Sequence, residues 1–342
     1  MPFVGLGDYL GSLDASGYVE EEWFVAGEEG GRPYTTTVVV RRPRDPAAFS
    51  GTLIVEPLHA MGATPVFMYT SQYVLRAGHA WAMVGSQKTA LEQHVKSFDA
   101  ERYASRNIEA EPAPEGTPPV DGSNPPMGDP EKMAAFFAEM QRRNAASSTI
   151  LAQVGAALRG GGGPLADLDI RNAILVGHSQ TGGVVTDYVL NAHDTQRNAD
   201  GSPVFDGYFP SGAARHAWEP RDSALVQVLS EGDISDPNRA GREGRQYRRD
   251  DSDEPGDRYR LYELAGVAHM GTRYPPHDSA ASWQQAPTAG RVPLDAVMNS
   301  LPHYELFSMA LDHLVRWVAD GVVPPRAERI EVGPDGWFAA DE

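Results

Sequence analysis

The amino-acid sequence predicts an α/β fold with a mostly parallel central sheet and helices on both of its faces. The first observation is that short apolar runs typical of strands recur along the chain and alternate with stretches of helical periodicity. The second is a strand, helix, strand pattern over residues 51–86, which is typical of parallel pairing. Because strands and helices interleave in one continuous pattern, we expect a single domain over residues 1–342.

The N-terminal part of the chain predicts an antiparallel pair followed by a parallel unit. Residues 17–27 and 33–42 are rich in β-branched and aromatic residues and are separated by the turn-like sequence EEGGR. Two apolar runs, residues 51–56 and 80–86, then flank a segment from residue 64 to 77 that can be helical.

The middle of the chain predicts an excursion and then a long helix. We expect residues 88–130 to form a surface excursion or part of a lid, because residues 111–130 are too rich in proline, glycine and polar residues to enter a core. Strong helix formers run through residues 131–160 and stop at a glycine run, which predicts one helix.

The C-terminal half continues the alternation. A strand is predicted at residues 171–178, a helix near 181–193, strands at 224–230 and 258–265, and a final helix at 303–319. The last helix carries Leu306, Ala310, Leu314 and Trp317 on one apolar stripe at helical spacing.

Composition and charge restrict the class of protein. Hydrophobic residues make up 41% of the chain and charged residues 22%, the balance of a folded enzyme. A net charge of -18 argues against nucleic acid or an anionic membrane as a partner. The absence of cysteine removes disulfides, thiolate metal sites and a cysteine nucleophile.

Further absences bear on location and cofactors. The chain has no apolar run long enough to span a membrane, and its first residues lack the basic start and apolar stretch of a secretory signal, so we expect a cytoplasmic protein. No HExxH motif or other cluster with metal-ligand spacing is present, so we expect no metal and no cofactor. The oligomeric state is not predicted.

The segment ILVGHSQTGG, residues 174–183, has the form of a nucleophile elbow, in which an apolar strand runs directly into a serine and a helix. The residues two before and two after such a serine must be small; Gly177 meets this requirement and Thr181 departs from it. The alternative for a serine between a strand and a helix is a plain N-cap. We predict that Ser179 is a nucleophile.

Three acidic residues, Glu231, Asp233 and Asp236, follow the strand at 224–230. They stand just beyond the carboxyl end of a strand, where the active sites of open α/β sheets lie. A triad acid orients the histidine and stabilises the imidazolium that forms. We predict Asp233 for this role with Glu231 as the alternative, against the simpler interpretation of a solvated acidic turn.

The predicted general base is His269, on a short turn after the strand that precedes it. The chain order Ser179, Asp233, His269 is the order in which α/β-hydrolase folds carry nucleophile, acid and histidine. Other histidines are less well placed. His178 is expected to point away from the nucleophile's side, and His303 belongs to the region of the C-terminal helix.

The loop PLHAMGATP, residues 57–65, occupies the position that supplies an oxyanion-hole amide in this fold. We expect backbone donors, namely the N–H of Ala60 and the N–H of Gln180, which directly follows the nucleophile.

The substrate pocket is expected to include His59, Met61 and Met270, and to be built by residues 88–130 and 270–300. For His59 an ordinary loop histidine is favoured over a role in proton transfer. Loop methionines more often pack their own loop than a ligand.

With these residues assembled, most of the chain resembles a bacterial family of poorly characterised, esterase-like α/β hydrolases. The matching segments are VEPLHAMG (55–62), RAGHAWAMVGSQ (76–87), GHSQTG (177–182), EGD (231–233), ELAGVAHM (263–270) and WVADGVVPP (317–325). Threonine at 181 is normal for that family, whereas His59 stands where the family more often has asparagine. The resemblance implies a serine-triad hydrolase fold and supplies no substrate.

The expected function is hydrolysis of a small-molecule carboxylic ester through an acyl-enzyme intermediate. The same triad could serve a lactone, a thioester, an amide or acyl transfer to an alcohol. An alternative of another class is a non-catalytic ligand-binding protein on a hydrolase fold, since a fold does not determine function.

Overall fold

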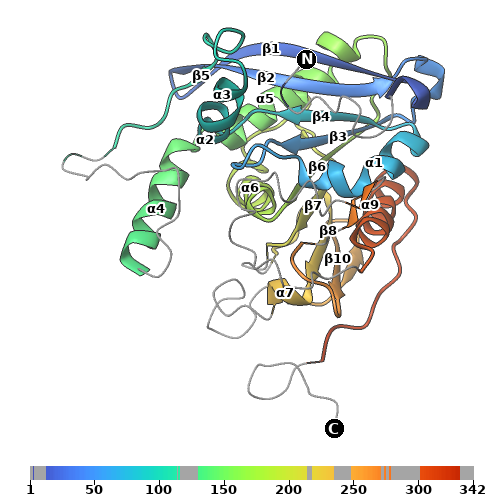
Figure 1. The fold of residues 1–342 in the computed structure, drawn as a ribbon. Helices are drawn as coiled ribbons and strands as arrows, with labels where there is room; N and C mark the ends of the chain where they lie inside the picture. The colour runs from blue at the N-terminus through green and yellow to red at the C-terminus, as the bar shows by residue number, and fades with distance from the viewer. Residues whose placement is uncertain are drawn as a thin grey trace.

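The computed structural model describes residues 3, 13–113, 115, 130–213, 218–234, 248–270, 273–274, 277–278 and 301–331. Within them, ten strands form one sheet in the order β1-β2-β4-β3-β6-β7-β8-β10-β9, with β5 paired to β2 (Figure 1). The strands are β1 (Tyr18–Glu29), β2 (Arg32–Pro43), β3 (Thr52–Pro57), β4 (Ala80–Val84), β5 (Asn107–Ile108), β6 (Asn172–His178), β7 (Gly207–Ser211), β8 (Ala224–Ser230), β9 (Ser252–Glu254) and β10 (Asp257–Leu264). A separate antiparallel pair joins β11 (Arg273–Tyr274) to β12 (His277–Asp278).

The central strands of the sheet run in one direction. The pairs from β4 through β3, β6, β7 and β8 to β10 are all parallel, and antiparallel pairing occurs only toward the two edges. The prediction of a mostly parallel sheet is therefore confirmed. Since the strands are parallel, their carboxyl ends meet at one edge, where the loops that follow β3, β6, β8 and β10 come together.

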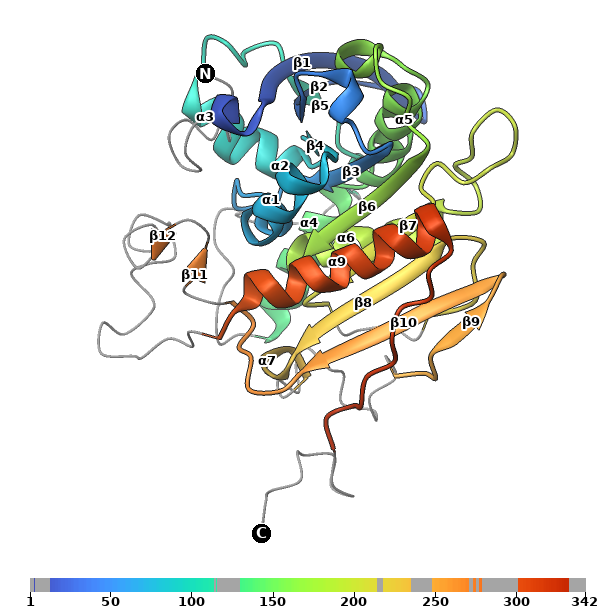
Figure 2. The same cartoon turned by 90° about the vertical axis from the view of Figure 1, so that its right-hand side faces the viewer.

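Helices cover both faces of the sheet. The longer helices are α1 (Pro65–Ala77), α4 (Pro130–Arg143), α5 (Ser147–Arg159), α6 (Gln180–Asp187) and α9 (His303–Asp320). Shorter helical segments are η1 (Leu13–Ser16), η2 (Pro46–Ala48), α2 (Lys88–Ala90), η3 (Leu91–Val95), α3 (Lys96–Phe98), η4 (Gly163–Leu165), η5 (Tyr188–Ala192) and α7 (Glu231–Ile234). Helices α1 and α9 pack together on one face, and α5 and α6 on the other (Figures 1 and 2).

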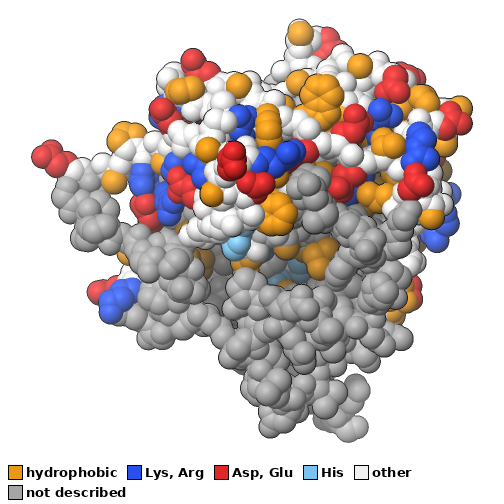
Figure 3. Space-filling model, turned by 45° about the horizontal axis from the view of Figure 1, so that its top comes forward, with side chains coloured by type: hydrophobic (Ala, Val, Ile, Leu, Met, Phe, Trp, Pro, Cys, Tyr) orange, Lys and Arg blue, Asp and Glu red, His pale blue; other side chains and the backbone are white. Residues whose placement is uncertain are grey.

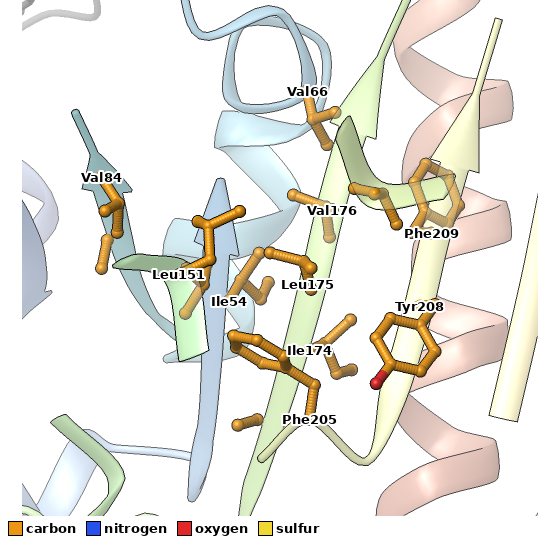
Figure 4. Packing of buried hydrophobic residues seen from close by; sticks show 14 of the residues in the cluster. Ile54, Val66, Val84, Leu151, Ile174, Leu175, Val176, Phe205, Tyr208 and Phe209 are labelled. Carbon is orange, nitrogen blue, oxygen red and sulfur yellow. The ribbon is translucent and has the colours of Figure 1, made fainter. Parts of the chain in front are cut away.

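The core lies between the strands and these helices. Its side chains include Ile54 of β3 and Ile174, Leu175 and Val176 of β6, all at most 1% exposed. Figure 4 shows them interleaved with aromatic side chains from the segment that leads into β7 and from β7 itself. Complete burial of such an aliphatic side chain contributes about 1.5–3 kcal/mol. Packing on both faces of β6 thus holds rigid the strand that ends at His178.

Most predicted elements lie where the sequence indicates, but the predicted helix at residues 131–160 is two helices. The break falls at Asn144, after α4 and before α5. The Asn144 carboxamide accepts the backbone N–H of Thr89 at 3.2 Å and donates to the Thr89 hydroxyl at 3.0 Å. These bonds hold the Asn144 side chain beside Thr89 at the junction of α4 and α5.

The stretch predicted as a surface excursion, residues 88–130, divides into two parts. Its first part folds against the core, because Leu91, Val95, Tyr103 and Ile108 are at most 1% exposed. The proline-rich part lies almost entirely outside the described residues. The role of this stretch as a lid and the single-domain organisation of the chain stay predictions.

Strand β7 has no counterpart among the predicted strands. Its sequence, GYFPS, contains a glycine and a proline, and proline is uncommon inside a sheet because it cannot donate a ladder hydrogen bond. Here the proline is accommodated at Pro210, next to the end of the strand.

No helix in the described part of the chain is long and apolar enough to cross a membrane.

Candidate active site

Ser179 lies on the sharp turn between β6 and α6. Its backbone has φ 59° and ψ -118°, and it is the one non-glycine residue with positive φ in the described part of the chain. Such a conformation costs of order 1–3 kcal/mol and persists only where the surrounding structure imposes it. A serine on a strained strand-to-helix turn has the geometry of a nucleophile elbow.

Two glycines allow this turn to form. A Cβ atom at Gly177 would overlap the carbonyl oxygen of Thr181, and one at Gly182 would overlap the carbonyl oxygen of Ser211. The second close approach is therefore at residue 182 and not at 181. The Thr181 hydroxyl instead accepts the N–H of His178 at 3.0 Å and donates to its carbonyl at 2.9 Å, so threonine stabilises the turn.

The three residues predicted as a triad lie in contact. The Oγ of Ser179 is 2.8 Å from Nε2 of His269, and Nδ1 of His269 bonds Oδ1 of Asp233. The Asp233 side chain is 1% exposed and that of His269 17%. The imidazole is therefore oriented from its buried side and presents its other nitrogen to the serine hydroxyl.

Asp233 lies in the short helix α7 that follows β8. Its second oxygen, Oδ2, accepts the backbone N–H and the hydroxyl of Ser230, each at 2.8 Å. Burial alone would raise the pKa of Asp233, but the hydrogen bond and charge of His269, with smaller contributions from His178 and the Ser230 N–H, lower that pKa to about 2. The carboxylate is therefore ionised at neutral pH.

The alternative acid, Glu231, serves another contact. Its Oε2 accepts the backbone N–H of Gly266 at 2.8 Å, which fixes the turn leading to His269. The third candidate, Asp236, lies outside the described residues.

The predicted oxyanion donors lie near each other, but one of them is engaged. The N–H of Ala60 donates to the side-chain Oε1 of Gln180 at 3.1 Å. Gln180 is also the first residue of α6, so its backbone N–H has no carbonyl partner earlier in the helix.

The Gln180 side chain is paired with Gln87. The two carboxamides exchange hydrogen bonds of 2.6 and 3.0 Å, and Gln87 also donates to the carbonyl of Leu58 at 2.8 Å. Gln87 is fully buried. This pair ties the loop after β3 to the start of α6, a connection that sequence reasoning missed.

Glu56 links the end of β3, which precedes this loop, to the first turn of α1, which follows it. Its buried carboxyl group accepts the backbone N–H groups of Val66 and Phe67 at 2.8 and 2.9 Å and the indole N–H of Trp81 at 3.2 Å. Burial raises the pKa of Glu56 to about 8, against the effect of these donors. A glutamate inside an otherwise apolar run was the available sequence signal for this buried anchor.

The predicted pocket residues are only partly enclosed. Met61 is 42% exposed, and Met270 and His59 are half-buried. The Nδ1 of His59 accepts the N–H of Met61 at 3.0 Å, and burial, with the nearby His269 and His94, lowers the pKa of His59 to about 4. Figure 3 shows histidine side chains beside hydrophobic ones on the face of the molecule that it presents. Most of segment 270–300 is outside the described residues.

The expectation that His178 points away from the site is wrong. Its ring stacks on that of His269, with centroids 4.9 Å apart and planes at 24°, and its Nε2 lies 3.1 Å from the carbonyl oxygen of His269. His303 also contacts this turn, through the carbonyl of Ala268 at 2.8 Å. The sequence around these histidines does not predict either contact, because each contact joins residues that are distant in the chain.

Among the described residues, no three histidine, aspartate or glutamate side chains are grouped so that they could hold a metal ion.

A match to a protein family agrees with this architecture. A family model described as alpha/beta hydrolase domain matches residues 2–342. No curated protein matches the chain. Solved structures that resemble it include a poly(3-hydroxybutyrate) depolymerase from Bordetella parapertussis, with 14% identity and a TM-score of 0.42 over 84% of this chain and 94% of that one.

Two further structures are similar at the same level. A dienelactone hydrolase from Anabaena variabilis has 10% identity and a TM-score of 0.39 over 78% of this chain and 94% of its own. An arylesterase has 12% identity and a TM-score of 0.41 over 85% and 84%. Likeness at this level says nothing about the substrate. The family model, in contrast, spans nearly every residue, and the chain therefore belongs to the alpha/beta hydrolase domain family and is a hydrolase.

Proposed function

We propose that this hydrolase cleaves a small-molecule carboxylic ester with Ser179 as nucleophile, His269 as general base and Asp233 as the triad acid. The observation that carries the proposal is the unbroken chain of contacts from Ser179 Oγ through the imidazole of His269 to the buried Asp233 carboxylate. A plain N-cap serine needs neither a positive φ nor a histidine at its hydroxyl.

The proposed reaction uses these three side chains in turn. His269 Nε2 takes the proton of the Ser179 hydroxyl as Oγ attacks the ester carbonyl carbon, and the carbonyl π electrons move onto its oxygen. When the tetrahedral intermediate collapses, the bond to the alkoxy oxygen breaks and His269 returns the proton to the leaving alcohol. A water molecule, deprotonated by His269, then attacks the acyl carbon and releases the carboxylic acid and the Ser179 hydroxyl.

Asp233 stabilises the imidazolium that exists during both steps. Its pKa of about 2 means that the negative charge is present throughout the physiological range. The carboxylate also keeps the hydrogen of the neutral imidazole on Nδ1, so that Nε2 is free to accept the serine proton.

The oxyanion is assigned to the backbone N–H groups of Gln180 and Ala60, each contributing about 3 kcal/mol to stabilisation of the transition state. Because the Ala60 N–H is bonded to the Gln180 side chain, this assignment requires that side chain to move aside when the substrate carbonyl enters.

Turnover of a panel of p-nitrophenyl esters with rising acyl length, with lactones alongside, tests the proposal. We expect hydrolysis of at least one ester, insensitivity to EDTA, and a loss of several orders of magnitude in Ser179→Ala. Ser223→Ala is the matched control, because Ser223 is also a buried serine but bonds the carbonyl of Phe205 near the start of β8. Full activity in Ser179→Ala, or activity that EDTA removes and zinc restores, contradicts the proposal.

The same panel separates the neighbouring alternatives. Preference for lactones over every open-chain ester would make the enzyme a lactonase using the same triad. Transfer of the acyl group to an added alcohol in preference to water would make it an acyltransferase. A folded protein that binds the compounds but turns over none of them would be a ligand-binding protein on a hydrolase fold.

A further inference from the structure

The turn that carries His269 is held by its backbone as well as by its side chain. It follows β10 and passes through Gly266, whose φ of 70° lies in the left-handed region. Two consecutive carbonyl oxygens of the turn, those of Ala268 and His269, each contact the imidazole of another histidine. Neither of these two histidines has a part in the proton transfers proposed above.

The first of them is His303, at the start of α9. It is fully buried, and its Nε2 lies 2.8 Å from the carbonyl oxygen of Ala268. Its Nδ1 lies 3.1 Å from the carbonyl oxygen of Leu301, and Tyr69 of α1 stacks on its ring with centroids 5.6 Å apart and planes at 21°. The ring is therefore fixed between α1 and α9, and it ties the His269 turn to that helix layer.

The second is His178, the last residue of β6. Its Nε2 contacts the carbonyl oxygen of His269 at 3.1 Å, and its Nδ1 lies 3.1 Å from the hydroxyl of Ser211. Because a carbonyl oxygen only accepts hydrogen bonds, the hydrogen of the neutral ring belongs on Nε2. His178 directly precedes Ser179, so one strand end both carries the nucleophile and contacts the turn of the base.

The contact between His178 Nε2 and the carbonyl oxygen of His269 can persist while His269 changes its protonation state. Burial, followed by repulsion from the charge of His269, lowers the pKa of His178 to about 3. His178 therefore stays neutral when His269 takes the serine proton, and its Nε2–H remains on the carbonyl of His269. The stacked ring contacts the imidazole without competing for its proton.

We propose that His178 and His303 are positioning residues, which hold the imidazole of His269 in line between Ser179 and Asp233 through hydrogen bonds to two consecutive backbone carbonyls. The inference rests on the proposed serine-hydrolase function and extends it to two residues that do not touch the reacting atoms. Since a displacement of about 1 Å can lower a rate on the order of 100-fold, loss of either bond should reduce the chemical step.

Paired substitutions separate the hydrogen bond from the ring. His178→Phe and His303→Phe keep a ring and remove the donor, whereas His178→Gln and His303→Gln lose the ring and keep an N–H near the Nε2 position. We expect each Phe variant to lower kcat about 10- to 100-fold with KM within about twofold, because the base shifts while the pocket stays the same. The Gln variants should recover part of the loss, and the rate at which a fluorophosphonate labels Ser179 should follow kcat.

His193→Phe is the matched control. His193 is 1% exposed and also has a partner at each ring nitrogen, the Tyr208 hydroxyl and the Asp222 carboxylate, both at 2.7 Å. These partners lie toward the amino ends of β7 and β8, away from the carboxyl edge. The control should lose stability and keep wild-type kcat and labelling.

Phe variants that fold, as judged by near-ultraviolet circular dichroism, and keep wild-type kcat and labelling overturn the positioning role. Gln variants that are no better than the Phe variants overturn it as well. If His178→Phe does not fold, the two His303 variants carry the same comparison. A wild-type protein that neither hydrolyses esters nor reacts with the probe contradicts the proposed function instead, so the two failures are distinguishable.

Discussion

The backbone N–H of Ala60 donates a hydrogen bond of 3.1 Å to the side-chain carbonyl of Gln180, the residue that follows the nucleophile. A donor proposed to bind the oxyanion thus has a hydrogen-bond acceptor within the protein itself. The Gln180 carboxamide is in turn paired with the buried Gln87, so its movement breaks the hydrogen bonds of that pair too.

The first prediction concerns this contact. In a crystal structure of the phosphonate adduct of Ser179, a phosphoryl oxygen should lie about 2.7–3.1 Å from the backbone nitrogens of both Ala60 and Gln180. The Gln180 side chain should have rotated away from Ala60, because one N–H cannot serve both acceptors well. An adduct in which the Ala60–Gln180 bond persists, with the phosphoryl oxygen bound elsewhere, would exclude Ala60 as an oxyanion donor.

The second prediction distinguishes the two acids. Asp233→Asn should lower kcat by roughly three to four orders of magnitude, because it removes the charge that stabilises the imidazolium and permits the wrong tautomer of His269. Glu231→Gln should lower kcat far less, because the carboxylate of Glu231 accepts the backbone N–H of Gly266 and not a hydrogen bond from His269. Steady-state kinetics of both variants on one ester decides the order, and a reversed order would assign the acid to Glu231.

The third prediction concerns the anchor of the oxyanion loop. Glu56→Ala leaves the N–H groups of Val66 and Phe67 and the indole of Trp81 without their acceptor. Since each orphaned buried donor costs about 1–3 kcal/mol, the free energy of unfolding should fall by about 3 kcal/mol or more in urea denaturation. Glu305→Ala is the matched control, an exposed first-turn carboxylate in α9 whose loss should cost under about 1 kcal/mol. Equal effects of the two substitutions would contradict the anchoring role.

The fourth prediction concerns pH. His79 is buried between the Ser50 and Tyr73 hydroxyls, and burial lowers its pKa to about 4, against about 6.5 in an unfolded chain. Between these pH values the unfolded chain binds a proton that the folded chain does not, so acidification destabilises the fold by up to about 1 kcal/mol per pH unit. His79→Gln cannot take this proton. Its free energy of unfolding should therefore fall less steeply than that of the wild type from pH 6.5 to 4, and parallel slopes would contradict the prediction.

Local patterns were sufficient to predict the mostly parallel sheet and to single out Ser179, Asp233 and His269, which lie in contact in the structure. Gly177 before Ser179 reflects a backbone requirement of the elbow that is visible within a few residues, and the chain order of serine, aspartate and histidine is the order in which this fold carries them. The elements β3, α1 and β4 also follow from local apolar patterns, apart from the buried Glu56 inside the apolar run of β3.

The structural features that the sequence did not predict depend on contacts between residues that are distant in the chain. Asn144, at the junction of α4 and α5, bonds Thr89, which lies 55 positions earlier in the chain. His178 contacts His269 across 91 positions, and Gln87 contacts Gln180 across 93. No periodicity or motif rule connects such pairs. The partner of a buried polar side chain can therefore be identified only in the folded structure.

Reaction of the native protein with a fluorophosphonate, followed by intact mass and peptide mapping, tests whether Ser179 is the nucleophile. A serine beside a neutral histidine base is nucleophilic, whereas an ordinary N-cap hydroxyl is not. We predict one adduct per chain, located on Ser179, absent after prior denaturation and strongly slowed in His269→Gln. A well-folded protein that acquires no adduct, or one that is modified at another serine while Ser179 stays free, would contradict the assignment of Ser179 as the nucleophile.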